Sequence, residues 1–308
     1  MTRKRKWLLG MVLVLATAAD RLVALGDPGL AQLIAFVRAG DEASRAAAAA
    51  AIDRHLAASP EGEPRANAAA GRLLDAFDTG NDAGRRAVLE LVPTILKRTG
   101  TAHAGRCREV VATGLRMADP ATRVLAVRLA LHPDLKLRAE LPPLLSDPDA
   151  VVRRAALFAV ASADGEPLIT DEELFRWLHD PDEGVRKACR DALVSRDRTE
   201  AEIGLGRRLT DPDPGERLKL LLDLRYDDDV ADPEPWLERL SRDPEPAVRA
   251  AAARVAVELT GDRRQACPAW VGRVADTDPD PTVRRVAGYF RRQPARPAGN
   301  DIRLTGGQ

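Results

Sequence analysis

Small and apolar residues recur at helical spacing along most of this 308-residue chain. Leu30, Leu33, Ile34 and Val37 form one such set, because steps of three and four residues return to the same face of an α-helix. No stretch alternates apolar and polar residues as a half-buried strand does. The pattern therefore predicts an all-α protein.

The predicted helices come in pairs, separated by short segments rich in Pro, Gly, Asp and Asn. Gly40, for example, is suited to end one helix and Asp41 to cap the next. About eight pairs fit between residues 27 and 291. Their predicted ranges are 29–39 and 42–58, 65–77 and 83–98, 101–117 and 121–131, 135–146 and 149–162, 171–179 and 182–194, 199–209 and 213–225, 233–241 and 245–259, and 264–275 and 280–291.

One phrase marks the junctions in the second half of the chain, and its fullest copy is DPDPTVRRVA from Asp278 to Ala287. Six copies are separated by steps of 28, 33, 31, 32 and 35 residues, a near-constant period that indicates a stacked repeat architecture. An apolar residue stands five places after the first Asp in five copies, and Arg follows this place in five of the six. The copies begin at Asp119, Asp147, Asp180, Asp211, Asp243 and Asp278, and the apolar residues are Val124, Val152, Val185, Val248 and Val283, with Glu216 as the exception.

The residues of the phrase are suited to end one helix and to start the next. Its first proline lacks an amide donor and disfavours helical backbone in the residue before it, so an incoming helix must stop there. The second Asp can accept hydrogen bonds from the free amides of the next helix, and a proline directly after it suits the first helical position. Asp213-Pro214 and Asp280-Pro281 fit both requirements.

These junctions resemble those of the HEAT-repeat superfamily, particularly the short units of about thirty residues also found in phycobilin-lyase-type proteins. The resemblance is good over residues 119–291 and weak over residues 27–118. It implies a right-handed α-solenoid over residues 27–291, in which Asp and Arg form a structural ladder between successive repeats. The ladder residues that it implies are Asp147, Arg153, Asp180, Arg186, Asp211, Arg217, Asp243, Arg249, Asp278 and Arg284. The alternative is that these arginines line a groove for an anionic ligand.

Composition narrows the function classes. Lys+Arg and Asp+Glu both number 47, so the formal net charge is zero. The chain therefore has no overall positive electrostatic potential that would attract nucleic acid. Four basic residues lie in the first six positions, and without them 43 basic residues face 47 acidic ones, a net charge of −4. Aromatic residues make up only 4% of the chain, so the core must consist mainly of Ala, Leu and Val, as suits closely stacked helices.

The two ends differ from the rest of the chain. Residues 1–19 combine a basic start, an apolar run from Trp7 and an Ala-Thr-Ala cleavage pattern, which predicts a secretory signal sequence and an exported protein, periplasmic or extracellular. The alternative is an uncleaved inner-membrane anchor formed by residues 7–19, although this run is shorter than a membrane span requires. Residues 292–308 are rich in Arg, Pro and Gly without an apolar face, and we expect a disordered tail.

No residue pattern predicts a catalytic, cofactor or metal site. Cys107, Cys189 and Cys267 fall in different predicted repeats, each inside a predicted helix, and are expected as buried free thiols. The four histidines, at positions 55, 103, 132 and 179, have no partner at metal-binding spacing. Residues 227–238 match three calcium-ligand positions of an EF-hand but place Asp232 where the turn requires Gly, so we expect a solvated loop.

The function expected from these features is a non-catalytic scaffold whose extended surface binds a protein or peptide. One alternative, suggested by the resemblance, is a lyase- or maturation-factor-like activity on a cofactor or a modified protein. A second alternative is nucleic-acid binding on an arginine-lined groove, which requires a continuous positive face. Neither nucleic acid nor a cofactor is expected as a partner, and contact with a membrane is expected only through an uncleaved N-terminal segment.

Overall fold

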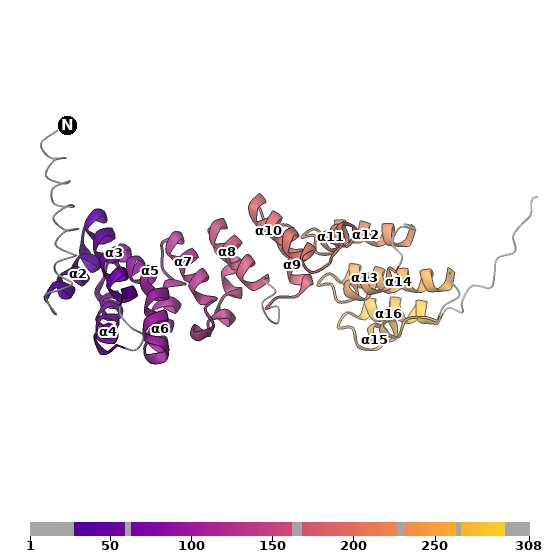
Figure 1. Ribbon diagram of the computed structural model, residues 1–308. Coiled ribbons are helices and arrows are strands. Elements are labelled where there is room, and N and C mark those ends of the chain that lie inside the picture. Colours follow the sequence, from indigo (N-terminus) through magenta and orange to yellow (C-terminus); the bar gives the residue numbers. More distant parts are fainter. Residues whose placement is uncertain (1–27, 59–62, 162–167, 227–231, 263–265, 293–308) are drawn as a thin grey trace, which may run out of the picture. The chain divides into compact units, whose positions relative to one another are not determined.

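The computed structural model describes residues 28–58, 63–161, 168–226, 232–262 and 266–292 (Figure 1). The regular elements in these ranges are α-helices and short 3-10 helices, and none of the described residues lies in a strand. The prediction of an all-α protein is confirmed. The predicted signal segment 1–19, residues 293–308 of the predicted tail and residues 227–231 of the calcium-like loop lie outside the described residues.

The chain divides into two compact units. The first unit comprises the chain up to Thr170 together with Asp182–Ala188, and the second comprises Asp171–Pro181 together with the chain from Cys189 onward. Helix α10 (Glu183–Val194) therefore begins in the first unit and ends in the second.

In the first unit, paired helices pack in two layers. The second helices of the pairs contact one another in chain order, α3 with α5, α5 with α7 and α7 with α8, while α2 contacts α4 and α4 contacts α6 (Figure 1). Within the pairs, α2 packs on α3, α4 on α5 and α6 on α7. The helices are α2 (Pro28–Ala39), α3 (Glu42–Ala58), α4 (Pro64–Thr79), α5 (Asp82–Thr99), α6 (Ala104–Gly114), α7 (Pro120–Ala130) and α8 (Ala150–Ala161).

The second unit repeats this pairing. Helix α11 packs on α12, α13 on α14 and α15 on α16, and the second helices α12, α14 and α16 contact one another in chain order. Leu221, Val248 and Val283 from these three helices lie in one buried core. The helices are α9 (Asp171–Trp177), the end of α10, α11 (Glu200–Leu209), α12 (Pro214–Tyr226), α13 (Glu234–Leu240), α14 (Pro246–Asp262), α15 (Ala269–Thr277) and α16 (Pro281–Arg291).

Side-chain caps explain where many of the second helices begin. The Asp280 carboxylate accepts hydrogen bonds from the backbone N–H of Thr282 and Val283, and Pro281 is the first helical residue. Asp213 likewise accepts from Gly215 N, before Pro214 opens α12. Such caps satisfy amides that have no partner within the helix. The same contact occurs at Asp41, Asn81, Asp119, Asp149 and Asp182.

The prediction of an α-helix over residues 135–146, the first helix of the fourth pair, is wrong. This stretch belongs to three 3-10 helices, η2 (Pro133–Leu135), η3 (Arg138–Glu140) and η4 (Pro142–Ser146). Pro142 and Pro143 supply no amide donor and restrict the residue before them, and Lys136 adopts a left-handed φ of 51°. Its leucines still fill the core, since Leu135, Leu137 and Leu141 are fully buried.

The helix predicted over residues 264–275 begins later, at Ala269. Pro268 precedes it and disfavours helical backbone at Cys267, which lies in a non-helical segment. The prediction that Cys267 is buried inside a helix is therefore wrong, and this thiol is exposed. Cys107 and Cys189 are buried free thiols, as predicted.

Two glycines mark places where helices approach too closely for a side chain. A Cβ atom at Gly84 in α5 would lie 2.4 Å from the carbonyl oxygen of Arg38 and 2.8 Å from that of Val37, both at the end of α2. A Cβ atom at Gly206 in α11 would lie 2.4 Å from the ring of Phe175, a buried residue of α9. Both contacts join neighbouring pairs within one unit.

Candidate functional site

An arginine at the fourth position of several second helices donates hydrogen bonds to the junction that precedes its helix. At Arg249 in α14, Nη1 donates hydrogen bonds to the carbonyl oxygens of Asp243 at 2.8 Å and Pro244 at 3.1 Å, just before the helix. Its Nε and Nη2 donate to the two carboxylate oxygens of Asp278 at 2.8 and 2.9 Å. One side chain thus closes its own junction and binds the next junction.

The same arrangement occurs twice more. Arg217 binds both carboxylate oxygens of Asp243 at 2.7 and 2.8 Å, and Arg123 binds both of Asp147 at 2.8 Å. Of the residues that the resemblance placed in a ladder, the structure therefore brings Arg217 to Asp243 and Arg249 to Asp278. We call the three pairs Arg123–Asp147, Arg217–Asp243 and Arg249–Asp278 the Asp–Arg ladder.

The other predicted ladder residues occupy equivalent positions in their junctions. Arg153 and Arg284 each donate from Nη1 to the carbonyl oxygens of the residues five and six places before them. Asp180 is buried, whereas Asp211 and Arg186 are half-buried. Asp211 also accepts a hydrogen bond from Asp213 N at 2.9 Å, which shapes the turn before α12.

Sequence reasoning missed Arg123. The copy of the phrase at Asp119 lacks its first Asp-Pro step, so Asp119 is itself the cap and accepts hydrogen bonds from the backbone N–H and the hydroxyl of Thr122. Counting from the cap instead of from the first Asp places Arg123 at the position of Arg217 and Arg249. It also places fully buried Thr122, rather than half-buried Val124, at the apolar position of the phrase.

The ladder charges are buried and already paired. Hydrogen bonding by Arg249 holds the pKa of Asp278 below its usual range, and the hydrogen bonds to Asp243 and Asp278 raise the pKa of Arg217 and Arg249. Four hydrogen bonds from each guanidinium leave few donors for an anionic ligand. Separating such a buried pair is costly, so its geometry favours a role in joining helix pairs.

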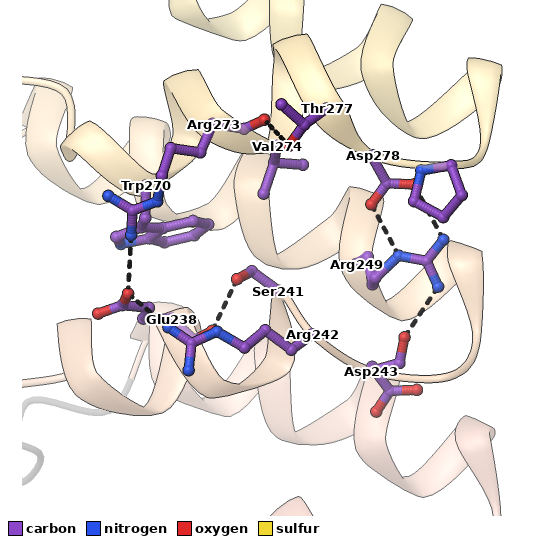
Figure 2. A pocket seen from close by; sticks show the side chains of 11 residues that line it. Glu238, Ser241, Arg242, Asp243, Arg249, Trp270, Arg273, Val274, Thr277 and Asp278 are labelled. Carbon is purple, nitrogen blue, oxygen red and sulfur yellow. Dashed lines mark hydrogen bonds and ion pairs between the residues drawn. The ribbon is translucent and has the colours of Figure 1, made fainter.

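A pocket of about 420 Å³ lies in the second unit beside the ladder pair Arg249–Asp278 (Figure 2). We call it the Trp270 pocket, because Trp270 and Val274 of α15 supply its apolar surface. The end of α13 and the turn after it contribute Glu238 and Arg242. Arg273 of α15 lines the same space.

Hydrogen-bond donors outnumber free acceptors in the Trp270 pocket. Arg242 Nη2 and Arg273 Nη2 both donate to the same Glu238 oxygen, each at 3.0 Å (Figure 2). Trp270 is 4% exposed, and its Nε1 makes no hydrogen bond within the described part of the chain. The carboxylate of Asp278 is occupied by Arg249. The pocket therefore suits a ligand that accepts hydrogen bonds and carries negative charge.

In three of the second helices the ninth residue is a large, exposed apolar side chain. Phe158 in α8 is 72% exposed, Leu222 in α12 is 55% exposed and Tyr289 in α16 is 57% exposed. Arg254 takes this position in α14, which contacts both α12 and α16. In the second unit Leu222, Arg254 and Tyr289 thus lie on the second helices α12, α14 and α16, and we call them the second-helix row.

The described residues contain no group of three His, Cys, Asp or Glu side chains placed to hold a metal ion. Burial raises the pKa of the Cys107 and Cys189 thiols to about 12, which keeps both thiols protonated and unreactive at neutral pH. His103 and His179 lie within hydrogen-bonding distance of the carbonyl oxygens of Asn67 and Arg207. These contacts hold His103 against the backbone of α4 and His179 against the backbone of α11.

Comparison of the chain with protein-family models and with curated proteins finds no match in either case. Within the described ranges, no helix has both the length and the apolar character needed to cross a membrane.

Proposed function

We propose that this chain is a non-catalytic scaffold that binds a protein or peptide on the outer surface of its second helices. In this proposal residues 27–291 form a right-handed α-solenoid of about eight HEAT-like helix pairs. A solenoid offers a long continuous surface because each pair contacts its neighbours in sequence and leaves one face of every helix free.

Three observations support the solenoid. Helix pairs contact one another in chain order within each unit. Capping residues recur at the start of the second helices, at positions 41, 81, 119, 149, 182, 213 and 280. Arginines at the fourth helical position connect one junction with the next. A repeated local geometry of this kind generates a regular stack.

The second-helix row is the observation that carries the binding role. Leu222 and Tyr289 expose more than half of their surface at one repeated position, and their helices are joined through α14. A helix that has no partner on one face is normally polar there, so large apolar residues at this repeated position indicate a surface that is covered in a complex.

Capture experiments test this role. Purified wild-type protein, immobilised and incubated with the extracytoplasmic fraction of its own cells, should retain a partner that the double variant Leu222→Asp/Tyr289→Asp loses. Both side chains are exposed, so the double variant should fold, as circular dichroism and urea unfolding can verify. The captured partner is then purified and its affinity for both proteins is measured.

Ala201→Asp is the matched control, because it places the same charge on an exposed residue of a first helix, α11. This variant should bind the partner as the wild type does. Equal binding of the purified partner to wild type and to the Leu222→Asp/Tyr289→Asp variant contradicts the proposed surface.

The two alternative functions gain no support from the described residues. Nucleic-acid binding needs arginines free to meet phosphates, whereas Arg123, Arg217 and Arg249 donate their hydrogen bonds to carboxylates and carbonyls. A lyase-like activity needs a positioned acid, base or nucleophile, and two of the three thiols are buried.

We further propose that residues 1–19 direct export and are removed. The support is the basic start, the apolar run and the small-residue cleavage pattern of this segment. N-terminal sequencing of protein isolated from its own cells should begin close to Ala19 or Asp20. Retention of Met1 in membrane pellets that resist alkaline extraction identifies the anchor formed by residues 7–19 instead.

A further inference from the structure

The Trp270 pocket is distinct from the second-helix row, and its volume limits the size of the ligand that it can bind. Its volume of about 420 Å³ lies at the lower end of the range for ligand sites, so it accommodates one amino-acid residue rather than a large cofactor. Arg242 and Arg273 stand at its exposed side, with side-chain exposures of 73% and 62%. An incoming chain can therefore reach both guanidinium groups.

The charges at this exposed side are unequal. Two guanidinium groups share the single carboxylate of Glu238, which leaves one positive charge in excess. The nearby carboxylates of Asp243 and Asp278 do not offset this charge, because Arg217 and Arg249 bind them bidentately. A carboxylate placed between Arg242 and Arg273 would restore neutrality and use their remaining N–H groups.

The apolar part of the pocket adds a second requirement. Trp270 and Val274 present apolar surface, while the buried Trp270 Nε1 lacks an acceptor among the described residues. The ligand must therefore combine a carboxylate and an apolar group within a short distance.

We propose that the Trp270 pocket binds the C-terminal residue of a partner polypeptide, with its carboxylate at Arg242 and Arg273 and its apolar side chain against Trp270 and Val274. A C-terminal apolar residue carries both groups on one Cα atom, as a pocket of this size requires. An internal Asp or Glu carries its carboxylate at the end of its own side chain and offers no such apolar group. This inference rests on the proposed binding function and names the chemistry that the partner supplies.

The test follows the indole N–H signal of Trp270 in ¹H–¹⁵N NMR spectra of the purified chain. The signal is assigned by its loss in the variant Trp270→Phe. The probe is the peptide acetyl-Gly-Ala-Leu with a free C-terminal carboxylate, and the comparison probes are its C-terminal amide and sodium acetate. We expect a saturable shift of the Trp270 signal with the free peptide and binding weaker by about tenfold or more with the amide, because a charge-assisted contact is lost.

Variants locate the contact. Arg273→Gln should weaken binding of the free peptide by about tenfold, and Arg242→Gln should do so similarly. Both side chains are exposed, so neither change should affect folding. Arg176→Gln is the matched control, since Arg176 is exposed, pairs with Glu172 on the same helix and lies outside both the pocket and the second-helix row. It should bind the peptide as the wild type does.

Each contrary result overturns a stated part of the proposal. An unchanged Trp270 signal, or equal shifts with the acid and the amide, removes the carboxylate site. Equal affinity for acetate and for the peptide removes the polypeptide as its source. If capture of a partner depends on Leu222 and Tyr289 but not on Arg273, the scaffold function stands and the pocket inference fails. If the peptide binds but capture does not depend on Leu222 and Tyr289, the proposed surface fails and the pocket remains.

Discussion

Arg85 in the first unit and Arg249 in the second unit occupy the same position in their helices but have different partners. Arg249 reaches forward to Asp278, whereas the place equivalent to Asp278, two residues before the next cap, holds Met117 in front of Arg85. Arg85 turns back instead: its Nε donates to the carbonyl oxygen of Phe77 at 3.2 Å and its Nη2 to that of Asp78 at 3.4 Å. Its guanidinium also lies 5.8 Å from the centre of the Phe77 ring.

The difference separates two tasks of the fourth-position arginine. Closing its own junction needs carbonyl oxygens, which every chain supplies, so this task persists in both units. Binding the next junction needs an aspartate two residues before its cap. The early junctions, which precede α5 and α7, have Thr79 and Met117 at this place. There the pairs are joined by close backbone contact, in which Gly84 meets the carbonyl oxygens of Val37 and Arg38.

Replacing the two arginines should give the largest contrast. Arg249→Met leaves the buried carboxylate of Asp278 without its partner, and we expect a loss of about 3–5 kcal/mol in the free energy of unfolding. Arg85→Met removes a partly exposed side chain with backbone and ring contacts, and we expect about 1 kcal/mol or less. Urea unfolding of both variants measures the difference. Similar losses for the two variants contradict the division of tasks.

A double variant sharpens this result. Arg249→Met combined with Asp278→Leu removes both charges, so it should recover much of the stability that Arg249→Met loses. The recovery will be incomplete, because Asp278 also accepts a hydrogen bond from Asp280 N at 2.9 Å. A double variant less stable than both single variants is inconsistent with a buried unpaired charge as the cause.

The early junctions should instead be sensitive to added volume. Gly84→Ala places a methyl group 2.4 Å from a backbone carbonyl oxygen that cannot move aside freely, and we expect destabilisation of about 1–3 kcal/mol. Gly105→Ala is the control, because no atom lies within 4 Å of its added Cβ in α6. This control should stay within about 1 kcal/mol of wild type in thermal or urea unfolding. Equal effects at the two glycines contradict the close contact.

Acid should weaken the ladder more than the early junctions. The pKa of Asp278 is lowered from 3.8, mainly by Arg249, so its stabilising contribution is complete above the unfolded pKa and is lost as pH falls through the lowered folded pKa. The stability gap between wild type and Asp278→Asn should therefore be constant near neutral pH and narrow below about pH 4. Urea midpoints at several pH values measure this gap. The gap for Arg85→Met should change little, and a pH-independent gap at Asp278 argues against the ion pair.

Several features could be predicted because their causes are local. The caps at Asp213 and Asp280 follow from an Asp-Pro step that ends one helix and starts another within a few residues. The later start of α15 could also have been predicted from the sequence, since Pro268 interrupts the predicted helix. The 3-10 helices around Pro142 and Pro143 follow the same rule, which the apolar spacing concealed.

The Trp270 pocket could not be predicted. Trp270 and Trp236 fall in predicted first helices with similar patterns, yet Trp270 is buried beside the pocket and Trp236 is half-buried against Phe175 and Arg239. Their environments depend on how deeply each helix packs. The bridge from Arg242 and Arg273 to one Glu238 oxygen likewise joins residues up to 35 positions apart.

By itself, the sequence determined the all-α class, the positions of the junctions and the repeat period, because capping, proline geometry and helical spacing act over a few residues. Tertiary structure decided which carboxylate each arginine meets, which large apolar residues stay exposed and where donors remain without acceptors. The physical reason is range: the ladder partners lie 24 to 29 residues apart, and their meeting depends on the packing of whole helices against one another.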